Sequence, residues 1–133
     1  MRASDIRRGV DLLVSRSDVD APFVRAAARK VPGLWLLMAA AADPRIVKIW
    51  LDRTPYSLRA ALEVPITRDL HDGVIQGFAL HLDVDDVVKA IAPRNVLWTD
   101  PTDWLGRVVP HLSGFVYRGF GEPDDRYLAE LLK

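Results

Sequence analysis

The fold is decided by residues 23–50, FVRAAARKVPGLWLLMAAAADPRIVKIW. A short apolar run from Phe23 to Ala28 is followed by an abrupt turn, Arg29 to Gly33, and then by a dense apolar segment that stops at Asp43-Pro44. A second short apolar run extends from Ile46 to Leu51. Lengths and breakers of this kind predict a strand, a sharp turn, a buried helix and a second strand. Such a unit requires two parallel strands joined by a right-handed crossover.

The rest of the chain alternates between predicted helices and strands. Apolar residues at helical spacing predict an amphipathic surface helix from Asp5 to Val14. Asp83 is suited to cap a helix that ends near Ala92. Compact or alternating apolar runs predict further strands at Asn95 to Thr99 and Phe115 to Phe120. A terminal helix, Asp124 to Leu132, is predicted to bury a face that carries Tyr127, Leu128, Leu131 and Leu132.

Less regular segments lie between these elements. A short helix is predicted from Tyr56 to Leu62, and the segment from Glu63 to Gly77 has few periodic features, so we expect it to cross the top of the sheet irregularly. Strands that alternate with helices throughout predict an α/β layered fold, with a mostly parallel sheet of about four strands flanked by helices. We expect one domain that spans residues 1–133.

Composition excludes several classes of protein. Half of the residues are hydrophobic, and eighteen basic side chains balance eighteen acidic ones, so no net field favours nucleic acid or an anionic membrane. The chain has no cysteine, which excludes disulfides and a cysteine nucleophile. The longest apolar stretch, Leu34 to Ala42, is about half the length of a bilayer span. No signal-peptide pattern follows Met1, so we expect a cytoplasmic protein with no membrane partner.

A family resemblance rests on four stretches: Asp5–Leu13 with Arg16–Asp20, Met38–Ile46, Ile91–Trp98 and Asp100–Asp103. In order and wording they resemble the second half of an α/β-hydrolase, in the branch of acetyl-xylan esterases and dienelactone hydrolases. The resemblance implies a partial hydrolase-like layered fold. It implies a half domain, because the strands that precede the first helix in that family have no counterpart in this sequence.

The resemblance also implies where a nucleophile would stand. In that family a serine occupies the sharp turn between strand and helix, small residues flank it, and the amino terminus of the helix helps to stabilise the oxyanion. Lys30 falls at this position, or Val31 if the register slips by one residue. Neither side chain can act as the serine does. Gly33 keeps the small-residue requirement, and Pro32 fixes a backbone angle at the helix start.

The acid and histidine positions are less complete. Asp103, or in second place Asp100, lies where the family keeps the carboxylate that orients its histidine. The same two residues are suited to cap a turn beside Pro101. No histidine follows the last predicted strand, and His111 precedes it. Trp104, in the loop after Asp103, is placed to line a pocket.

No metal site or cofactor is expected. His71, His81 and the aspartates near them have suitable ligand atoms, but Asp83, Asp85 and Asp86 are explained by the start of a helix.

We therefore expect a degenerate, non-catalytic hydrolase-like domain, a pseudoenzyme that pairs with a copy of itself or with a partner chain that completes its sheet. A half sheet exposes a long edge and an apolar face, which soluble proteins rarely leave open. The alternative is a carboxylic-ester or acyl hydrolase that a partner polypeptide completes. A third interpretation is a small binding module that uses Glu63 to Gly77 as its contact surface.

Overall fold

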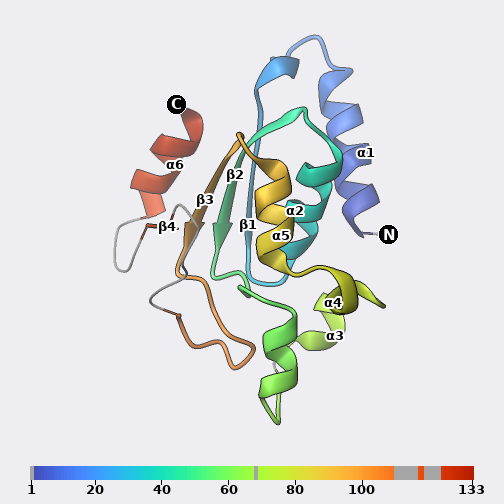
Figure 1. Cartoon of the computed structure of the whole chain (residues 1–133). Coiled ribbons are helices and arrows are strands. Elements are labelled where there is room, and N and C mark those ends of the chain that lie inside the picture. The colour runs from blue at the N-terminus through green and yellow to red at the C-terminus, as the bar shows by residue number, and fades with distance from the viewer. Residues whose placement is uncertain (1, 68, 110–116, 119–123) are drawn as a thin grey trace.

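The computed structural model describes residues 2–67, 69–109, 117–118 and 124–133. A parallel sheet contains β1 (Val24–Arg29), β2 (Ile46–Asp52) and β3 (Asn95–Thr99), in that order, and helices flank it (Figure 1). The two residues of β4 (Tyr117–Arg118) pair with β3 in parallel. The prediction of an α/β fold with a parallel sheet is confirmed. The strand predicted from Phe115 to Phe120 falls mostly outside the described residues.

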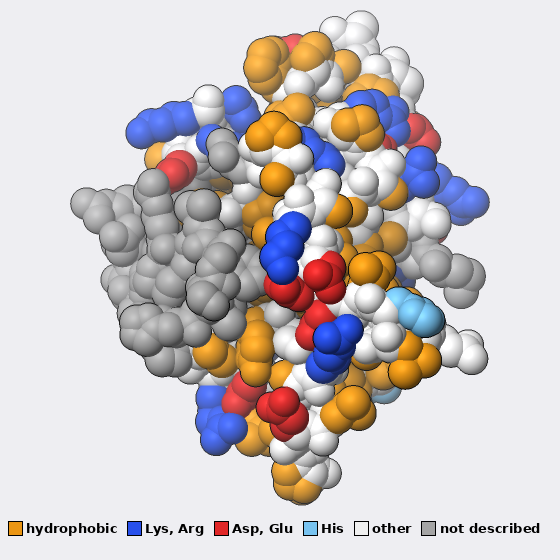
Figure 2. Space-filling model, viewed as in Figure 1, with side chains coloured by type: hydrophobic (Ala, Val, Ile, Leu, Met, Phe, Trp, Pro, Cys, Tyr) orange, Lys and Arg blue, Asp and Glu red, His pale blue; other side chains and the backbone are white. Residues whose placement is uncertain are grey.

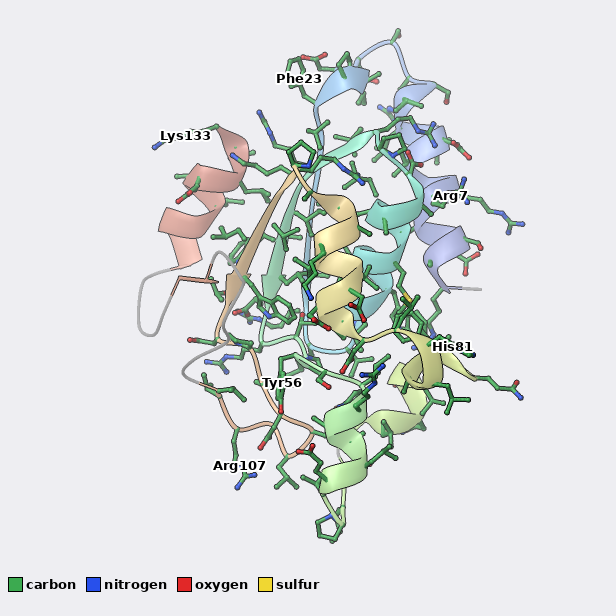
Figure 3. The ribbon with its side chains drawn as sticks, in the orientation of Figure 1. Arg7, Phe23, Tyr56, His81, Arg107 and Lys133 are labelled. Carbon is green, nitrogen blue, oxygen red and sulfur yellow. The ribbon has the colours of Figure 1, made fainter. Side chains whose placement is uncertain are left out.

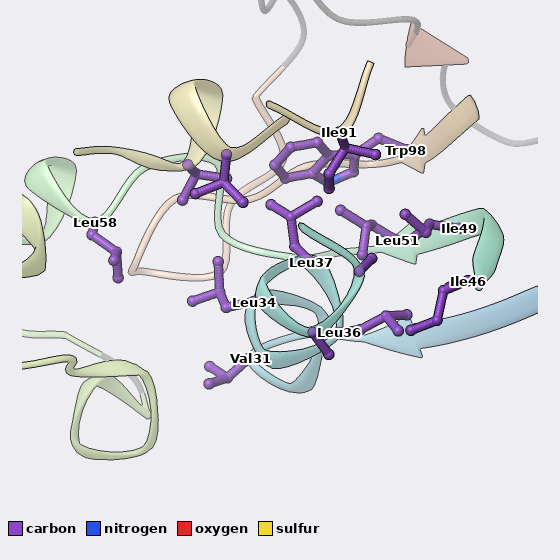
Figure 4. Packing of buried hydrophobic residues seen from close by; sticks show 14 of the residues in the cluster. Val31, Leu34, Leu36, Leu37, Ile46, Ile49, Leu51, Leu58, Ile91 and Trp98 are labelled. Atoms are coloured by element: carbon purple, nitrogen blue, oxygen red, sulfur yellow. The ribbon is translucent and has the colours of Figure 1, made fainter. Parts of the chain in front are cut away.

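The central unit is the one that residues 23–50 predicted. Helix α2 (Pro32–Ala42) connects β1 to β2, and the pairing of Ala28 with Leu51 and of Arg29 with Asp52 fixes the register of the two strands. Leu34, Leu37 and Ile49 are almost completely shielded from solvent. They belong to the main hydrophobic cluster, which lies between the helix and the sheet (Figure 4). The burial of α2 explains why its sequence is apolar on nearly every side.

Two more helices pack against α2, and one helix lies across the sheet from it. Helices α1 (Arg2–Val14) and α5 (Val84–Ile91) both contact α2. Helix α6 (Asp124–Leu132) contacts β2 instead, and the Lys48 ammonium donates a 2.7 Å hydrogen bond to the Glu130 carbonyl. Because side chains alternate along a strand, Lys48 and the buried Ile49 point to opposite faces. Helix α6 therefore covers the face that α2 does not (Figure 1).

The buried face predicted for the terminal helix is only partly correct. Leu131 is buried, but Leu128 and Leu132 are exposed, and the side chain of Tyr127 lies outside the described part. The prediction failed because α6 packs mainly on one strand, so the sheet covers a narrower stripe of the helix than the sequence pattern suggests.

The amino terminus of α5 confirms the predicted cap. The Asp83 carboxylate accepts 2.7 Å hydrogen bonds from the backbone N–H groups of Val84 and Leu58, and the Asp86 side chain accepts one from the Asp83 N–H. This reciprocal pattern is a capping box. Asp83 also ties the segment after β2 to the helix.

The segment between β2 and α5 contains only short helical turns. A 3-10 helix, η2, covers Arg59–Glu63 and replaces the longer helix predicted from Tyr56. Single turns follow at α3 (Leu70–Gly73) and α4 (Phe78–His81), and another 3-10 turn, η1 (Ala21–Phe23), precedes β1. Within the described residues, no helix has the length and hydrophobicity needed to cross a bilayer.

Candidate functional site

Each of the three main strands is followed by a residue whose backbone is left-handed. Lys30 follows β1 with φ 59°, Arg53 follows β2 with φ 48°, and Asp100 follows β3 with φ 44°. This region disfavours residues other than glycine by about 1–2 kcal/mol. The strands are parallel, so their carboxyl ends lie at the same end of the sheet. The three strained turns therefore all lie at this carboxyl end.

Backbone hydrogen bonds hold two of these turns to the neighbouring strand. The N–H of Lys30 donates to the carbonyl of Asp52 at 2.8 Å, and the N–H of Arg53 donates to the carbonyl of Thr99 at 2.9 Å. Each of these bonds extends the hydrogen bonding between two strands by one residue beyond the end of the strand. The positions of both basic residues are fixed by the sheet itself.

The strand-to-helix turn after β1 separates the two residues proposed for the nucleophile position. Lys30 is exposed at the left-handed position, whereas Val31 is buried in the core. Gly33 packs so closely on the buried Thr54 that a Cβ atom there would lie 1.9 Å from the Thr54 hydroxyl oxygen. Only glycine fits at that point, because Thr54 is completely shielded and has no room to move.

A cavity of about 280 Å³ opens beside these turns. It brings together Lys30 and Asp103, which the sequence assigned to the nucleophile and acid positions. Tyr56 and Arg107, labelled in Figure 3, mark the end of the sheet at which it lies. Its described lining residues are Lys30, Val31, Arg53, Pro55, Asp69, Thr102, Asp103, Trp104 and Gly106.

The Asp103 carboxylate is engaged within its own loop. One oxygen accepts 2.9 Å hydrogen bonds from the backbone N–H groups of Leu105 and Arg107, and the other accepts a 2.7 Å bond from the Arg107 guanidinium. Burial opposes ionisation of Asp103, but these donors outweigh it and lower the pKa of the carboxyl below its ordinary value. Among the described residues, the donors that hydrogen-bond to the Asp103 carboxylate all belong to the same loop, residues 103–107.

Asp100 and His71 are not among the described lining residues of this cavity. One carboxylate oxygen of Asp100 is buried and has no hydrogen-bond partner within the described residues. His71 is exposed beside Asp72, and His111 lies outside the described part. No three histidine, aspartate or glutamate side chains gather as metal ligands in the portion of the chain that the structure describes.

The sequence predicted part of the cavity lining and missed the rest. Trp104 lines the cavity as expected, and its indole N–H donates to the Ser57 carbonyl at 2.7 Å. Arg53 was not identified, although a signal existed: Lys30 and Arg53 are each followed two positions later by proline. Asp69 carries no such signal, because only the tertiary fold brings it to the strand ends.

A second hollow, of about 510 Å³, lies at the opposite end of β1. Phe23 and Leu13 line it with 56% and 44% of their surfaces exposed. Figure 2 shows exposed hydrophobic side chains at the top of the molecule, the end at which Figure 3 labels Phe23.

Comparison with protein-family models finds no match to this chain, and no curated protein matches it.

Proposed function

We propose that the chain is a degenerate hydrolase-like α/β domain that acts by association through the free edge of β1, and that it works in the cytoplasm. In this proposal the layers follow the second half of an α/β-hydrolase, and residues 115–120 supply a fourth strand. The observation that carries it is the position of β1 at the edge of the described sheet. The outer N–H and C=O groups of an edge strand form a template for another strand.

Exposed apolar surface beside β1 supports the same conclusion. The hollow that Phe23 and Leu13 line is adjacent to the start of the strand, and Ala27 is exposed further along it. An added strand would supply backbone hydrogen bonds, while the hollow would accept one of its apolar side chains. Exposed apolar surface of this kind is typical of protein-protein contacts.

The turn after β1 supports the loss of catalysis. Lys30 occupies the left-handed position at the strand-to-helix turn, where the resembling family has serine. Within the described residues, the Asp103 carboxylate accepts hydrogen bonds from the Arg107 guanidinium and from the loop backbone, and none from a histidine. An exposed lysine side chain cannot take the role of the serine hydroxyl in acyl transfer.

Charge limits the partner that β1 would accept. Arg25 and Arg29 lie on this strand, and like charges placed opposite each other destabilise a strand pair. Arg29 is already paired with Asp52. In a pair of two β1 strands, the register must therefore keep Arg25 and Arg29 of one copy from lying opposite those of the other. A different partner strand would pair more favourably if it placed aspartate or glutamate opposite these arginines.

The test is the molar mass in solution, measured by light scattering at micromolar concentration. We expect dimers or larger species for the wild type and a shift toward monomer for Phe23→Asp, because a charge there blocks the hollow. Leu62→Asp is the matched control, since Leu62 is 86% exposed, belongs to η2 and is not among the described residues that line the hollow. A well-folded wild-type monomer would overturn the proposal.

A second candidate is an ester or acyl hydrolase that a partner chain completes. It is favoured by one observation: Lys30 and Asp103 line the same cavity. The assay is hydrolysis of a chromogenic short-chain ester by the chain alone and together with candidate partners. Activity that persists in Asp103→Ala and resists a serine-directed fluorophosphonate would exclude a triad of the hydrolase type.

A further inference from the structure

We propose that the cavity at the carboxyl ends of β1 and β2 binds a small organic anion, with Lys30 and Arg53 holding its carboxylate or phosphate group. This site is distinct from the edge of β1 and does not depend on association there. The resembling family's oxyanion is held by backbone groups, whereas the proposed site uses two side chains of this particular chain.

Lys30 and Arg53 have charged groups without a partner in the part of the chain that the structure describes. Within the described residues, neither the Lys30 ammonium nor the Arg53 guanidinium forms a hydrogen bond or an ion pair, and both residues line the cavity. Two other arginines are engaged in ion pairs: Arg45 binds Asp43 and Asp11, and Arg107 binds Asp103. A guanidinium and an ammonium placed beside one cavity are suited to the oxygens of a carboxylate or phosphate.

The balance of charge in the cavity favours an anion. Among its described lining residues four are charged: Lys30 and Arg53 are basic, Asp69 and Asp103 are acidic. The charge of Asp103 is offset by the Arg107 guanidinium, 2.7 Å away. Among the described lining residues, the two cations Lys30 and Arg53 and the carboxylate of Asp69 then leave one net positive charge for a ligand to neutralise.

Backbone strain concentrates around the same cavity. Among the described residues, positive φ angles occur at Lys30, Arg53, Asp69, Asp100, Gly77 and Gly106. A positive φ strains only the residues other than glycine, and of these Lys30, Arg53 and Asp69 line the cavity, whereas Asp100 is not among its described lining residues. Residues held in sparsely populated backbone regions cost of order 1–3 kcal/mol and cluster at ligand sites. Lys30 and Arg53 therefore lie at the cavity in turns that directly follow β1 and β2, and no movement of a flexible loop is needed to bring them there.

The rest of the lining indicates the body of the ligand. Val31, Pro55 and Trp104 provide an apolar wall, and the Trp104 N–H is occupied by the Ser57 carbonyl. The cavity volume of about 280 Å³ is at the lower limit for ligand pockets, which fits a small molecule. The ligand class is therefore an oxyanion head group on a short apolar or aromatic body.

The experiment is a titration with benzoate and with phenyl phosphate, followed by calorimetry and by the NMR signal of the Trp104 indole N–H. Benzamide is the neutral control. We expect saturable binding of at least one anion, a shift of the Trp104 signal, and no saturation with benzamide. The anion that binds more tightly identifies the head group as carboxylate or phosphate.

Variants separate this site from general electrostatics. Lys30→Met and Arg53→Met should each weaken binding about tenfold, and the double variant should abolish it. Arg16→Met is the matched control, because Arg16 pairs with Asp18 on the exposed loop after α1. The proposal is overturned if neither anion saturates, if benzamide binds equally well, or if the double variant binds like the wild type. Molar mass by light scattering, recorded on the same samples, reports the association separately.

Discussion

The two ends of the sheet differ in how their charged side chains are paired. At the amino end, the buried Asp43 carboxylate accepts hydrogen bonds from the backbone and guanidinium of Arg45, and Arg45 also reaches Asp11 on α1. The Arg94 guanidinium donates to the carbonyls of Asp43 and Ile46. These bonds join α1, the α2–β2 loop and the entry to β3.

The carboxyl end leaves charged groups available instead. Among the described residues, Lys30 and Arg53 form hydrogen bonds only through their own backbone atoms, and both hold a disfavoured backbone conformation. The paired charges at the amino end therefore stabilise the fold. At the carboxyl end Arg29 is paired with Asp52 and Arg107 with Asp103, but Lys30 and Arg53 have no side-chain partner among the described residues and are placed to bind a ligand. Ligand sites of parallel α/β sheets lie at the carboxyl ends of the strands.

The largest expected effect comes from a steric clash between the two turns that follow β1 and β2. Gly33→Ala would place a Cβ atom 1.9 Å from the hydroxyl oxygen of Thr54, which follows Arg53 directly. Because Thr54 is fully buried, relief requires movement of the helix or of the turn. We expect a loss of about 3 kcal/mol in the free energy of unfolding, measured by urea denaturation.

Gly9→Ala provides the control for that substitution. Gly9 lies inside α1 with nothing within 4 Å of an added Cβ atom, so alanine should stabilise the protein by about 1 kcal/mol. Equal effects of the two substitutions would contradict the close contact between Gly33 and Thr54.

The next largest effect on stability is expected from a substitution that removes a charge at the amino end of the sheet. Asp43→Asn should lower the free energy of unfolding by about 2 kcal/mol at neutral pH, because the amide cannot accept all the bonds that Arg45 donates. Asp18→Asn, at an exposed ion pair with Arg16, should leave stability unchanged.

The pH dependence of Asp43→Asn has a definite sign. The Arg45 guanidinium, as the largest cause, lowers the pKa of the Asp43 carboxyl below its ordinary value of about 4. The stabilising contribution is then complete above pH 4 and is lost as the pH falls through the folded-state pKa. The difference between wild type and variant should shrink in acid, and a constant difference down to pH 2 would contradict this origin.

The smallest effect relieves strain at the carboxyl end. Lys30→Gly and Arg53→Gly should each raise the free energy of unfolding by about 0.5 kcal/mol, since glycine adopts a positive φ without penalty but loses more freedom on folding. Lys89→Gly, within α5, should instead cost about 1 kcal/mol. Thermal or urea unfolding of all three variants decides whether the two turns are strained.

The sequence predicted the elements whose own residues dictate them. The apolar runs around Pro32 and Asp43 determine the crossover unit, and Asp83 determines the start of α5 through contacts only a few residues away. The cavity could not be predicted in full, because Asp69 and Arg53 come together only after residues far apart in sequence have packed. The exposure of Leu128 and Leu132 likewise depends on how much of α6 the sheet covers.

The most direct test of the contrast between the two ends is the melting temperature of Lys30→Gly/Arg53→Gly, with and without the anion that binds best. Without ligand, the double variant should melt at or above the temperature of the wild type. Saturating anion should raise the melting temperature of the wild type, as binding to the native state requires, and leave that of the variant unchanged. A variant that melts several degrees below the wild type, or gains the same shift from the anion, would contradict the account.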